Sequence, residues 1–311
     1  MMKKEMLKNR NFWHAGKRSF PSVLIVAFLA LLLIGAAGCP AQNATTASST
    51  VGLTMAFVDN APPASVTVNK DFPIYVDIIN AGGANMDKAG AKFYLSGIGY
   101  NLEGISTPLA NVNLLDKSST FAERLNFAPN AKWTFELQNI FVLPLLLTSC
   151  YKYGTVASST ICVTASNESK ICSIAGDKAV TNTAAPIQIS KLTESVSGNK
   201  LTISFNIENK GTGQVYTPDA DCDKLQQSDI NEALKQKKVL IAVKTDPGFA
   251  CKLESETPPY SPVNTLSGST DIGAVECSKQ ITEGDHSAPL TVILQYKYRD
   301  SISKSISILP A

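Results

Sequence analysis

The stretch IYVDIINAG, residues 74–82, decides the fold class, because its apolar and polar side chains alternate. A period of two is that of a β-strand with one buried face. A second stretch, Leu201 to Ile207, alternates in the same way. Short runs of this kind, separated by Gly, Pro, Asn and Asp, continue from Gly52 to the end of the chain. The sequence therefore predicts an all-β body.

The deciding stretch occurs twice. Ile74-x-Val76-x-Ile78-x-Asn80-x-Gly82 returns 129 residues later as ISFNIENKG, residues 203–211. A second block, with Pro-Leu, Tyr-Lys-Tyr and a final Ile-x-Val or Ile-x-Ile, spans 144–163 and returns at 289–308 with every spacing unchanged. Two blocks in the same order indicate a duplicated unit. At 311 residues the chain has room for about two domains.

We therefore expect two tandem immunoglobulin-like β-sandwich domains, at 52–172 and 186–311, joined by a polar linker at 173–185. The second block lies 145 residues after the first, so the second domain holds an insertion of 16 residues between its blocks. We place this insertion near 221–238, where Asp229-x-x-Glu232 resembles a capping box that would begin a short helix. A polar loop is the alternative.

The repeated residues have expected roles. Asn-x-Gly at a strand end is typical of a tight turn with positive φ. Tyr-x-Tyr places both rings on one face of a strand. We expect a loop after each Tyr-Lys-Tyr and then a final strand that closes a hairpin. The apolar stretch Phe141 to Leu147 is predicted to be a buried strand.

The alternating strand that ends in Asn-x-Gly, present in the front half of both predicted domains, resembles the CARDB type. This is the cell-adhesion-related, immunoglobulin-like domain of bacterial and archaeal surface proteins. The resemblance implies tandem sandwiches on an exported chain, an adhesive or scaffolding role, and no shared catalytic residues. The cysteines and the Tyr-Lys-Tyr blocks are not part of that family's general pattern, so the chain resembles a distinct, archaeal-type relative.

The N-terminus, residues 1–38, is predicted to be a signal peptide or membrane anchor helix. Six basic residues and one acidic residue precede the apolar run Val23 to Ala37, which is the layout of an export signal. The ending Ala36-Ala37-Gly38-Cys39 resembles the lipobox of prokaryotic lipoproteins, although that family usually has Leu where Ala36 stands. This resemblance implies lipid attachment at Cys39.

An uncleaved span from Phe20 to Gly38 is the alternative anchor. A pilin-type signal fits less well, because those signals carry an acidic residue early in the apolar stretch and none lies between Arg18 and Asp59. Residues 39–51 are small and polar and predict a flexible tether. Both anchors place the body at the outer face of the cytoplasmic membrane, on the cell surface.

Seven cysteines divide into Cys39 at the signal and six in the body. An even set in an exported chain indicates disulfides, and lipidation accounts for the seventh cysteine. Spacing favours Cys162 with Cys172 first and Cys251 with Cys277 second. Cys150 and Cys222 complete the set of candidates.

Composition excludes several classes of function. The residues beyond the apolar run carry a slight excess of acidic over basic side chains, without a basic stripe, so we expect no nucleic-acid partner. The body holds one histidine, His286, which we interpret as a solvated turn residue and not as part of a catalytic triad. With cysteines oxidised, no zinc or redox-metal set is expected.

Two further kinds of site are predicted. Asp219, Asp221 and Asp223 form the densest acidic cluster, and alternate carboxylates suit Ca²⁺. Lys224 and Ile230 break the EF-hand pattern, however, so the alternative is a solvated loop beside Cys222. Asn43 and Asn167 each begin an N-glycosylation acceptor pattern.

The expected function is therefore that of a non-catalytic adhesion or cell-envelope scaffold protein, without a cofactor apart from the structural Ca²⁺ considered above. It would be anchored in a membrane and bind a protein or envelope glycan. A ligand-binding lipoprotein serving a transport system is the alternative, although the chain shows no βα alternation of the kind found in solute-binding folds. An exported hydrolase is a third hypothesis, for which no pair of acid and base residues is suitably spaced.

Overall fold

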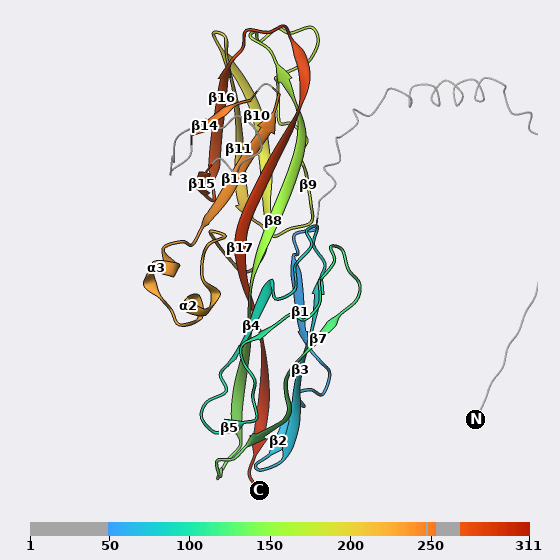
Figure 1. The fold of residues 1–311 in the computed structure, drawn as a ribbon, viewed down its shortest axis with the longest axis vertical. Helices are drawn as coiled ribbons and strands as arrows, with labels where there is room; N and C mark the ends of the chain where they lie inside the picture. Colours follow the sequence, from blue (N-terminus) through green and yellow to red (C-terminus); the bar gives the residue numbers. More distant parts are fainter. Residues whose placement is uncertain (1–48, 247, 253–267) are drawn as a thin grey trace, which may run out of the picture. The chain divides into compact units, whose positions relative to one another are not determined.

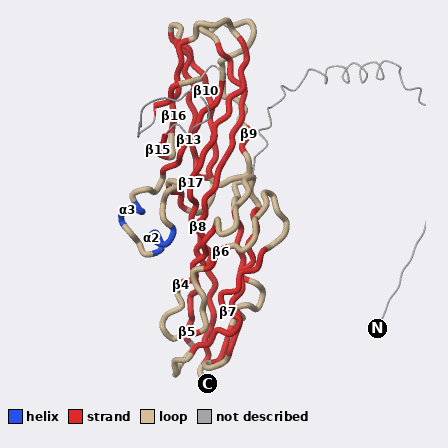
Figure 2. Tube along the Cα trace, viewed as in Figure 1, coloured by secondary structure: helices blue, strands red, loops and turns tan. Residues whose placement is uncertain are grey.

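The computed structural model describes residues 49–246, 248–252 and 268–311, which belong to one compact unit. Most of this part is β-strand, and the strands form three sheets (Figure 2). The predicted signal or anchor at 1–38 and Cys39 lie outside the described residues.

Two four-stranded sheets contain the alternating stretches that the sequence repeats. The first has the strand order β1 (Leu53–Phe57), β3 (Asp71–Asn80), β7 (Glu123–Trp133) and β5 (Leu102–Glu103). The second has the order β10 (Ile187–Ser197), β11 (Lys200–Asn209), β16 (Ala274–Gln280) and β14 (Ala250–Lys252). In β3 and β11 every second side chain is buried, as the period of two predicts.

The third sheet has nine strands and contributes to both sandwiches. Its main order is β15 (Gly268–Asp271), β13 (Lys238–Thr245), β17 (His286–Leu309), β8 (Phe141–Val163), β4 (Ala91–Ser96) and β6 (Leu109–Ala110). Three short strands pair beside this path: β12 (Gln214–Tyr216) and β2 (Ser65–Thr67) with β17, and β9 (Thr181–Asn182) with β8.

The long strands β8 and β17 run side by side through both sandwiches (Figure 1). All 23 residues of β8 pair with β17 in one antiparallel register without a bulge. At a rise of about 3.3 Å per residue, this pair is about 75 Å long. The hairpins expected after each Tyr-Lys-Tyr do not form, and the residues expected to be loops continue as strand.

Because the pair is antiparallel, the two long strands pass between the sandwiches in opposite directions. β8 begins beside β4 in the first sandwich and ends beside β9 in the second. β17 begins beside β13 in the second sandwich and ends beside β2 in the first. Each repeat therefore sends the second half of its last strand into the sandwich of the other. The segment 173–185, predicted to be a linker, contributes β9 to the nine-stranded sheet.

One hydrophobic cluster fills both sandwiches. It contains the alternating residues of β3 and β11 together with inward-facing residues of β8 and β17. The predicted insertion forms two short helices, α2 (Cys222–Gln226) and α3 (Ile230–Ala233), between β12 and β13 (Figure 2). Of these two helices, α3 begins where the sequence predicts, with Asp229 as its N-cap.

Candidate functional site

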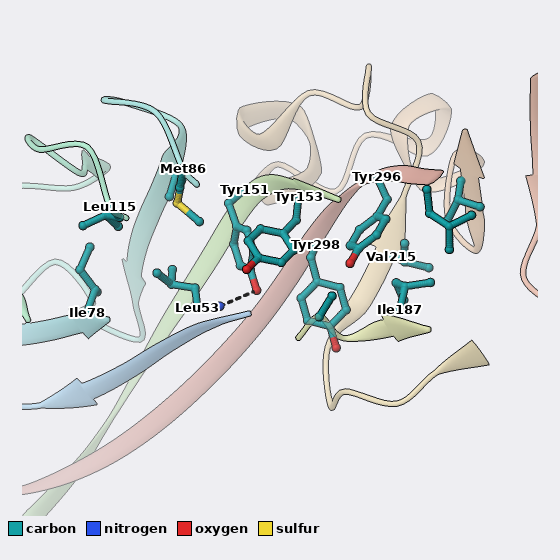
Figure 3. Packing of buried hydrophobic residues seen from close by; sticks show 14 of the residues in the cluster. Leu53, Ile78, Met86, Leu115, Tyr151, Tyr153, Ile187, Val215, Tyr296 and Tyr298 are labelled. Atoms are coloured by element: carbon teal, nitrogen blue, oxygen red, sulfur yellow. Dashed lines mark hydrogen bonds between the residues drawn. The ribbon is translucent and has the colours of Figure 1, made fainter. Parts of the chain in front are cut away.

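Four tyrosines gather where β8 and β17 pass from one sandwich into the other (Figure 3). We call Tyr151, Tyr153, Tyr296 and Tyr298 the tyrosine cluster. Tyr153 pairs with Tyr296 and Tyr151 pairs with Tyr298 across the two strands. The ring centroids of neighbouring members lie 5.6 to 6.5 Å apart, mostly edge to face, a favourable arrangement for aromatic rings. All four are buried.

The first Asn-x-Gly stretch binds one hydroxyl of this cluster. Tyr153 Oη donates to Asn80 Oδ1 at 3.2 Å, and the backbone N–H of Ala84 donates to Tyr153 Oη at 3.3 Å. Asn80 Nδ2 in turn donates to the carbonyl of Ala84 at 2.8 Å, and the N–H of Gly82 donates to Asn80 Oδ1. The turn after β3 is therefore held to β8 by a closed ring of hydrogen bonds.

The second Asn-x-Gly stretch repeats this network contact for contact. Tyr298 Oη donates to Asn209 Oδ1 at 3.3 Å and accepts from the N–H of Gly213 at 2.7 Å. Asn209 Nδ2 donates to the carbonyl of Gly213 at 2.8 Å, and Gly211 N–H donates to Asn209 Oδ1 at 3.1 Å. The two repeats thus use equivalent residues at equivalent places, although each tyrosine is in a strand shared by both sandwiches.

The glycines of the two stretches are needed for close approach and not for positive φ. Neither Gly82 nor Gly211 has a positive φ, so that part of the sequence interpretation is wrong. A Cβ at Gly82 would overlap the Tyr153 hydroxyl, and a Cβ at Gly211 would overlap the Tyr298 hydroxyl. The absence of a side chain lets the tyrosine reach the turn.

The remaining hydroxyls bind the first residues of the two sandwiches. The N–H of Leu53 donates to Tyr151 Oη at 3.2 Å (Figure 3). Tyr296 Oη lies 3.0 Å from Thr155 Oγ1 and accepts a backbone hydrogen bond from Ile187. Burial raises the pKa of Tyr298 to about 12 and raises the pKa of the other three above its ordinary value. The cluster therefore stays neutral and binds backbone groups through uncharged hydroxyls.

On the other face of the same strands, duplication brings positive charges together. Lys152 of β8 lies directly opposite Lys297 of β17, and Arg299 and Lys92 both lie opposite Cys150. Like charges that face each other across a sheet are unfavourable. This face therefore requires counter-charges.

The insertion supplies acceptors for three of these cations, namely one carboxylate, one backbone carbonyl and one side-chain amide. Asp223 accepts from Lys92 Nζ at 2.5 Å and from Tyr94 Oη at 2.7 Å. Lys297 donates to the carbonyl of Ala220, and Arg299 donates to Gln226 at 2.9 Å. Hydrogen bonds from Lys92 and Tyr94 hold the pKa of Asp223 below its ordinary value. Burial lowers the pKa of Lys297, against the opposing effect of nearby acidic residues of the insertion.

Inside the insertion, the other carboxylates fix its two helices. Asp221 caps α2 by accepting from the N–H groups of Asp223 and Lys224. Glu232 is buried and accepts from the N–H of Asp221 at 2.7 Å, so the expected capping box is only half formed. Lys235 joins Asp219 at 3.0 Å to Glu232 at 3.2 Å.

The calcium prediction gains no support from these positions. Asp219 pairs with Lys235, Asp221 caps α2, and Asp223 binds Lys92 and Tyr94. Within the described ranges, no group of three or more His, Cys, Asp or Glu side chains is placed to hold a metal ion. The acidic cluster serves as an internal counter-charge.

The six body cysteines form three disulfides, Cys150–Cys222, Cys162–Cys172 and Cys251–Cys277. The two pairs favoured by spacing are confirmed. Cys150–Cys222 joins β8 to α2, with Tyr94, Tyr216, Ala220 and Leu225 packed around it. This disulfide therefore links the insertion, which belongs to the second repeat, covalently to the first half of β8, which belongs to the first repeat.

Sequence reasoning missed one buried ion pair. The side chain of Glu194 is fully buried, and its Oε2 lies 3.1 Å from Lys178 Nζ. Its Oε1 accepts from the N–H of Cys162 at 2.7 Å. Burial raises the pKa of Glu194 above its ordinary value, and the hydrogen bond from Cys162 and the charge of Lys178 oppose that effect. The pair holds residues of the 173–185 segment to the second sandwich, and no sequence motif marks it.

The other predicted residues lie apart from this site. His286 is the half-exposed first residue of β17, with Nδ1 2.8 Å from the carbonyl of Gly284. Asn167 is exposed in the turn after β8, whereas Asn43 lies outside the described residues. No helix in the described part of the chain has the length and apolar character needed to cross a membrane.

Neither the protein-family models nor the curated proteins provide a match to this chain.

Proposed function

We propose that the chain is a membrane-anchored, extracytoplasmic protein whose two immunoglobulin-like sandwiches form a rigid, non-catalytic spacer for adhesion or envelope scaffolding. The β8–β17 pair supports this proposal most strongly. Tandem domains ordinarily move about a short linker. Here every residue of β8 is hydrogen-bonded or paired with β17 across the junction, so bending would disrupt a continuous ladder.

The clamp around the junction adds to its stiffness. Cys150–Cys222 ties α2 to β8, and Asp223 ties the same helix to β4. Three disulfides in one body suit an oxidising compartment. Together with the export-signal layout of residues 1–38, they support a location at the outer face of the cytoplasmic membrane, with lipid attachment at Cys39 or a span from Phe20 to Gly38.

The partner we propose is a protein or envelope glycan bound by exposed loops, as is usual for sandwich domains. A pocket in the described part of the second sandwich, lined by Ala157, Ile189 and Leu290 among others, has a volume of about 10 Å³. This is about the space of one water molecule, so this pocket is too small for a transported ligand.

Two measurements test the proposal. Intact mass on chain extracted from membranes should show a lipid adduct on a chain that begins at Cys39. An unmodified full-length mass rejects lipidation and leaves an uncleaved membrane span as the proposed anchor.

The rigidity of the junction is tested by measuring a distance between the two sandwiches. Lys70→Cys and Lys200→Cys in the Cys39→Ser chain are spin-labelled for pulsed electron paramagnetic resonance. We expect one narrow distance distribution, and a broad one contradicts a rigid junction.

A further inference from the structure

Large apolar side chains are exposed at the end of the first sandwich that lies beside the C-terminus in Figure 1. We call this set the apolar tip, and its members are Tyr100, Phe135, Ile140, Phe141 and Val142. Their exposed fractions are 105%, 56%, 62%, 40% and 55%. The sequence predicts that the stretch 141–147 is a buried strand. Leu143, Leu145 and Leu147 are buried, whereas Leu146 is exposed.

The members of the apolar tip come from neighbouring segments. Phe141 stacks on Trp133 with ring centroids 5.2 Å apart, and Trp133 Nε1 donates to the carbonyl of Phe135. The N–H of Thr134 donates to the carbonyl of Asn101, which places the Tyr100 loop beside the Phe135 loop. Exposed apolar side chains that gather at one end of a domain mark a candidate interaction site in soluble proteins.

The duplication supplies an internal control for this surface. The positions equivalent to Ile140, Phe141 and Val142 in the second repeat are Asp285, His286 and Ser287. His286 and Ser287 begin β17 in the same way that Phe141 and Val142 begin β8, and Asp285 and Ile140 directly precede these strands. The strand therefore forms with polar residues at these positions. Apolar side chains at Ile140 and Val142 are therefore not required for the strand to form.

Two charged residues beside the apolar tip have polar partners. Lys132 lies 3.1 Å from Asp71, and Glu136 accepts a hydrogen bond from Asn69 Nδ2 at 3.2 Å. A surface of aromatic and aliphatic side chains matches the interfacial zone of a bilayer, where tyrosine rings are enriched. It offers little to attract a strongly charged macromolecule.

The length of the chain outside the structure agrees with a membrane as the occupant. Ser49 enters the described body beside the tyrosine cluster, where its carbonyl accepts from Ala185 N–H at 3.1 Å. Cys39 lies ten positions earlier in the chain, and ten residue-to-residue steps span at most about 35 Å. The apolar tip lies about ten residues of β8 from the same cluster, which is about 35 Å as well.

We propose that the apolar tip inserts into the surface of the membrane that carries the N-terminal anchor. This inference rests on the proposed anchor. The sandwich would then contact the bilayer at two places, through the anchor and through exposed side chains of the first repeat, and the second sandwich would stay free to meet a partner.

The test uses the full chain with phosphatidylcholine vesicles and an environment-sensitive dye on one added cysteine. Tyr100→Cys reports on the apolar tip, and Ile171→Cys, a 69% exposed position beside Cys172 at the second sandwich, is the matched control. We expect a several-fold rise in dye emission at position 100 and none at 171. The double variant Ile140→Asp, Val142→Ser should abolish the rise while thermal unfolding stays unchanged.

Other outcomes overturn the inference in distinguishable ways. If the chain floats with the vesicles and neither dye responds, the anchor stands and the membrane contact of the tip is wrong. If the unaltered chain does not float with the vesicles, the anchor fails and the tip does not hold the membrane alone. A dye response at position 100 that needs no vesicles and rises with protein concentration would show that a second copy covers the tip.

Discussion

Lys152 lies directly opposite Lys297, at the centre of the antiparallel β8–β17 pair. On either side of this central pair, every pair of facing residues has a counterpart pair in which each residue is replaced by its equivalent from the other repeat. Leu145 pairs with Lys304, for example, and their counterparts Leu290 and Ser159 pair with each other. The two repeats are thus related by an approximate twofold axis through the junction, as in a dimer whose last strands are exchanged.

The equivalent tyrosine hydroxyls should contribute unequally to stability. Tyr153 bonds to the buried Asn80, whereas Tyr298 bonds to the exposed Asn209. Because a buried group that loses its partner cannot turn to water, Tyr153→Phe should lower the free energy of unfolding by about 1–3 kcal/mol. Tyr298→Phe should cost less, about 0.5–1 kcal/mol. Urea unfolding of both variants checks this order, and equal losses would argue against it.

Adding a methyl group at the repeated glycines should be costly. Gly82→Ala and Gly211→Ala should each lower the free energy of unfolding by about 1–3 kcal/mol, because the Cβ meets a tyrosine hydroxyl. Gly284→Ala is the matched control, since nothing lies within 4 Å of its Cβ. Combining Gly82→Ala with Tyr153→Phe should recover part of the loss. Full additivity of the two changes would contradict the contact.

Acid should release the insertion from β4. Hydrogen bonds hold the pKa of Asp223 below 3.8 in the folded chain. Because the pKa of Asp223 is lower in the folded chain than in the unfolded chain, ionised Asp223 stabilises the fold at pH values above 3.8. This stabilisation is lost as the pH falls through the lower pKa of the folded chain. Thermal unfolding of the unaltered chain and Asp223→Asn should therefore differ at pH 6 and converge near pH 2. A constant difference would rule out this ion pair as its source.

The disulfide that clamps the insertion should stabilise the chain most. Cys150–Cys222 closes a loop with a sequence separation of 72, against 10 for Cys162–Cys172. Chain entropy then gives about 4 kcal/mol for the first and about 3 kcal/mol for the second. Replacing each pair by alanine and measuring guanidinium unfolding checks the ranking. Hydrogen exchange should also rise in 217–236 after loss of the first pair only.

Strand content and local chemistry could be predicted because they depend on neighbouring residues. Alternation at Ile74, Val76 and Ile78 gave the buried face of β3, and Asp229 marked the start of α3. Cys162 and Cys172 were paired from their spacing. The repeat also indicated that Asn80 and Asn209 have one role, although the role involves a tyrosine hydroxyl and not a positive φ.

The exchange of strands could not be predicted, because alternation shows which face of a strand is buried and not which strand it joins. The segment after Tyr153 looked like a loop since its inward residues, Thr155 and Ala157, are small. Thr155 is accommodated inside because Oγ1 donates to the carbonyl of Ile187 at 2.6 Å. Lys92 and Tyr94 were missed for a related reason, since their partner Asp223 belongs to the other repeat.

Cysteine cross-linking between β8 and β17 tests the exchange most directly. Leu146 of the first repeat lies opposite Ser303 of the second, and both are exposed. The residue of the first repeat equivalent to Ser303 is Ser158, which is exposed as well. Our account predicts that Leu146→Cys forms an intrachain disulfide with Ser303→Cys and none with Ser158→Cys, as read by mass spectrometry of monomeric protein. A disulfide between positions 146 and 158 would contradict it, because each repeat would then keep its own final strands.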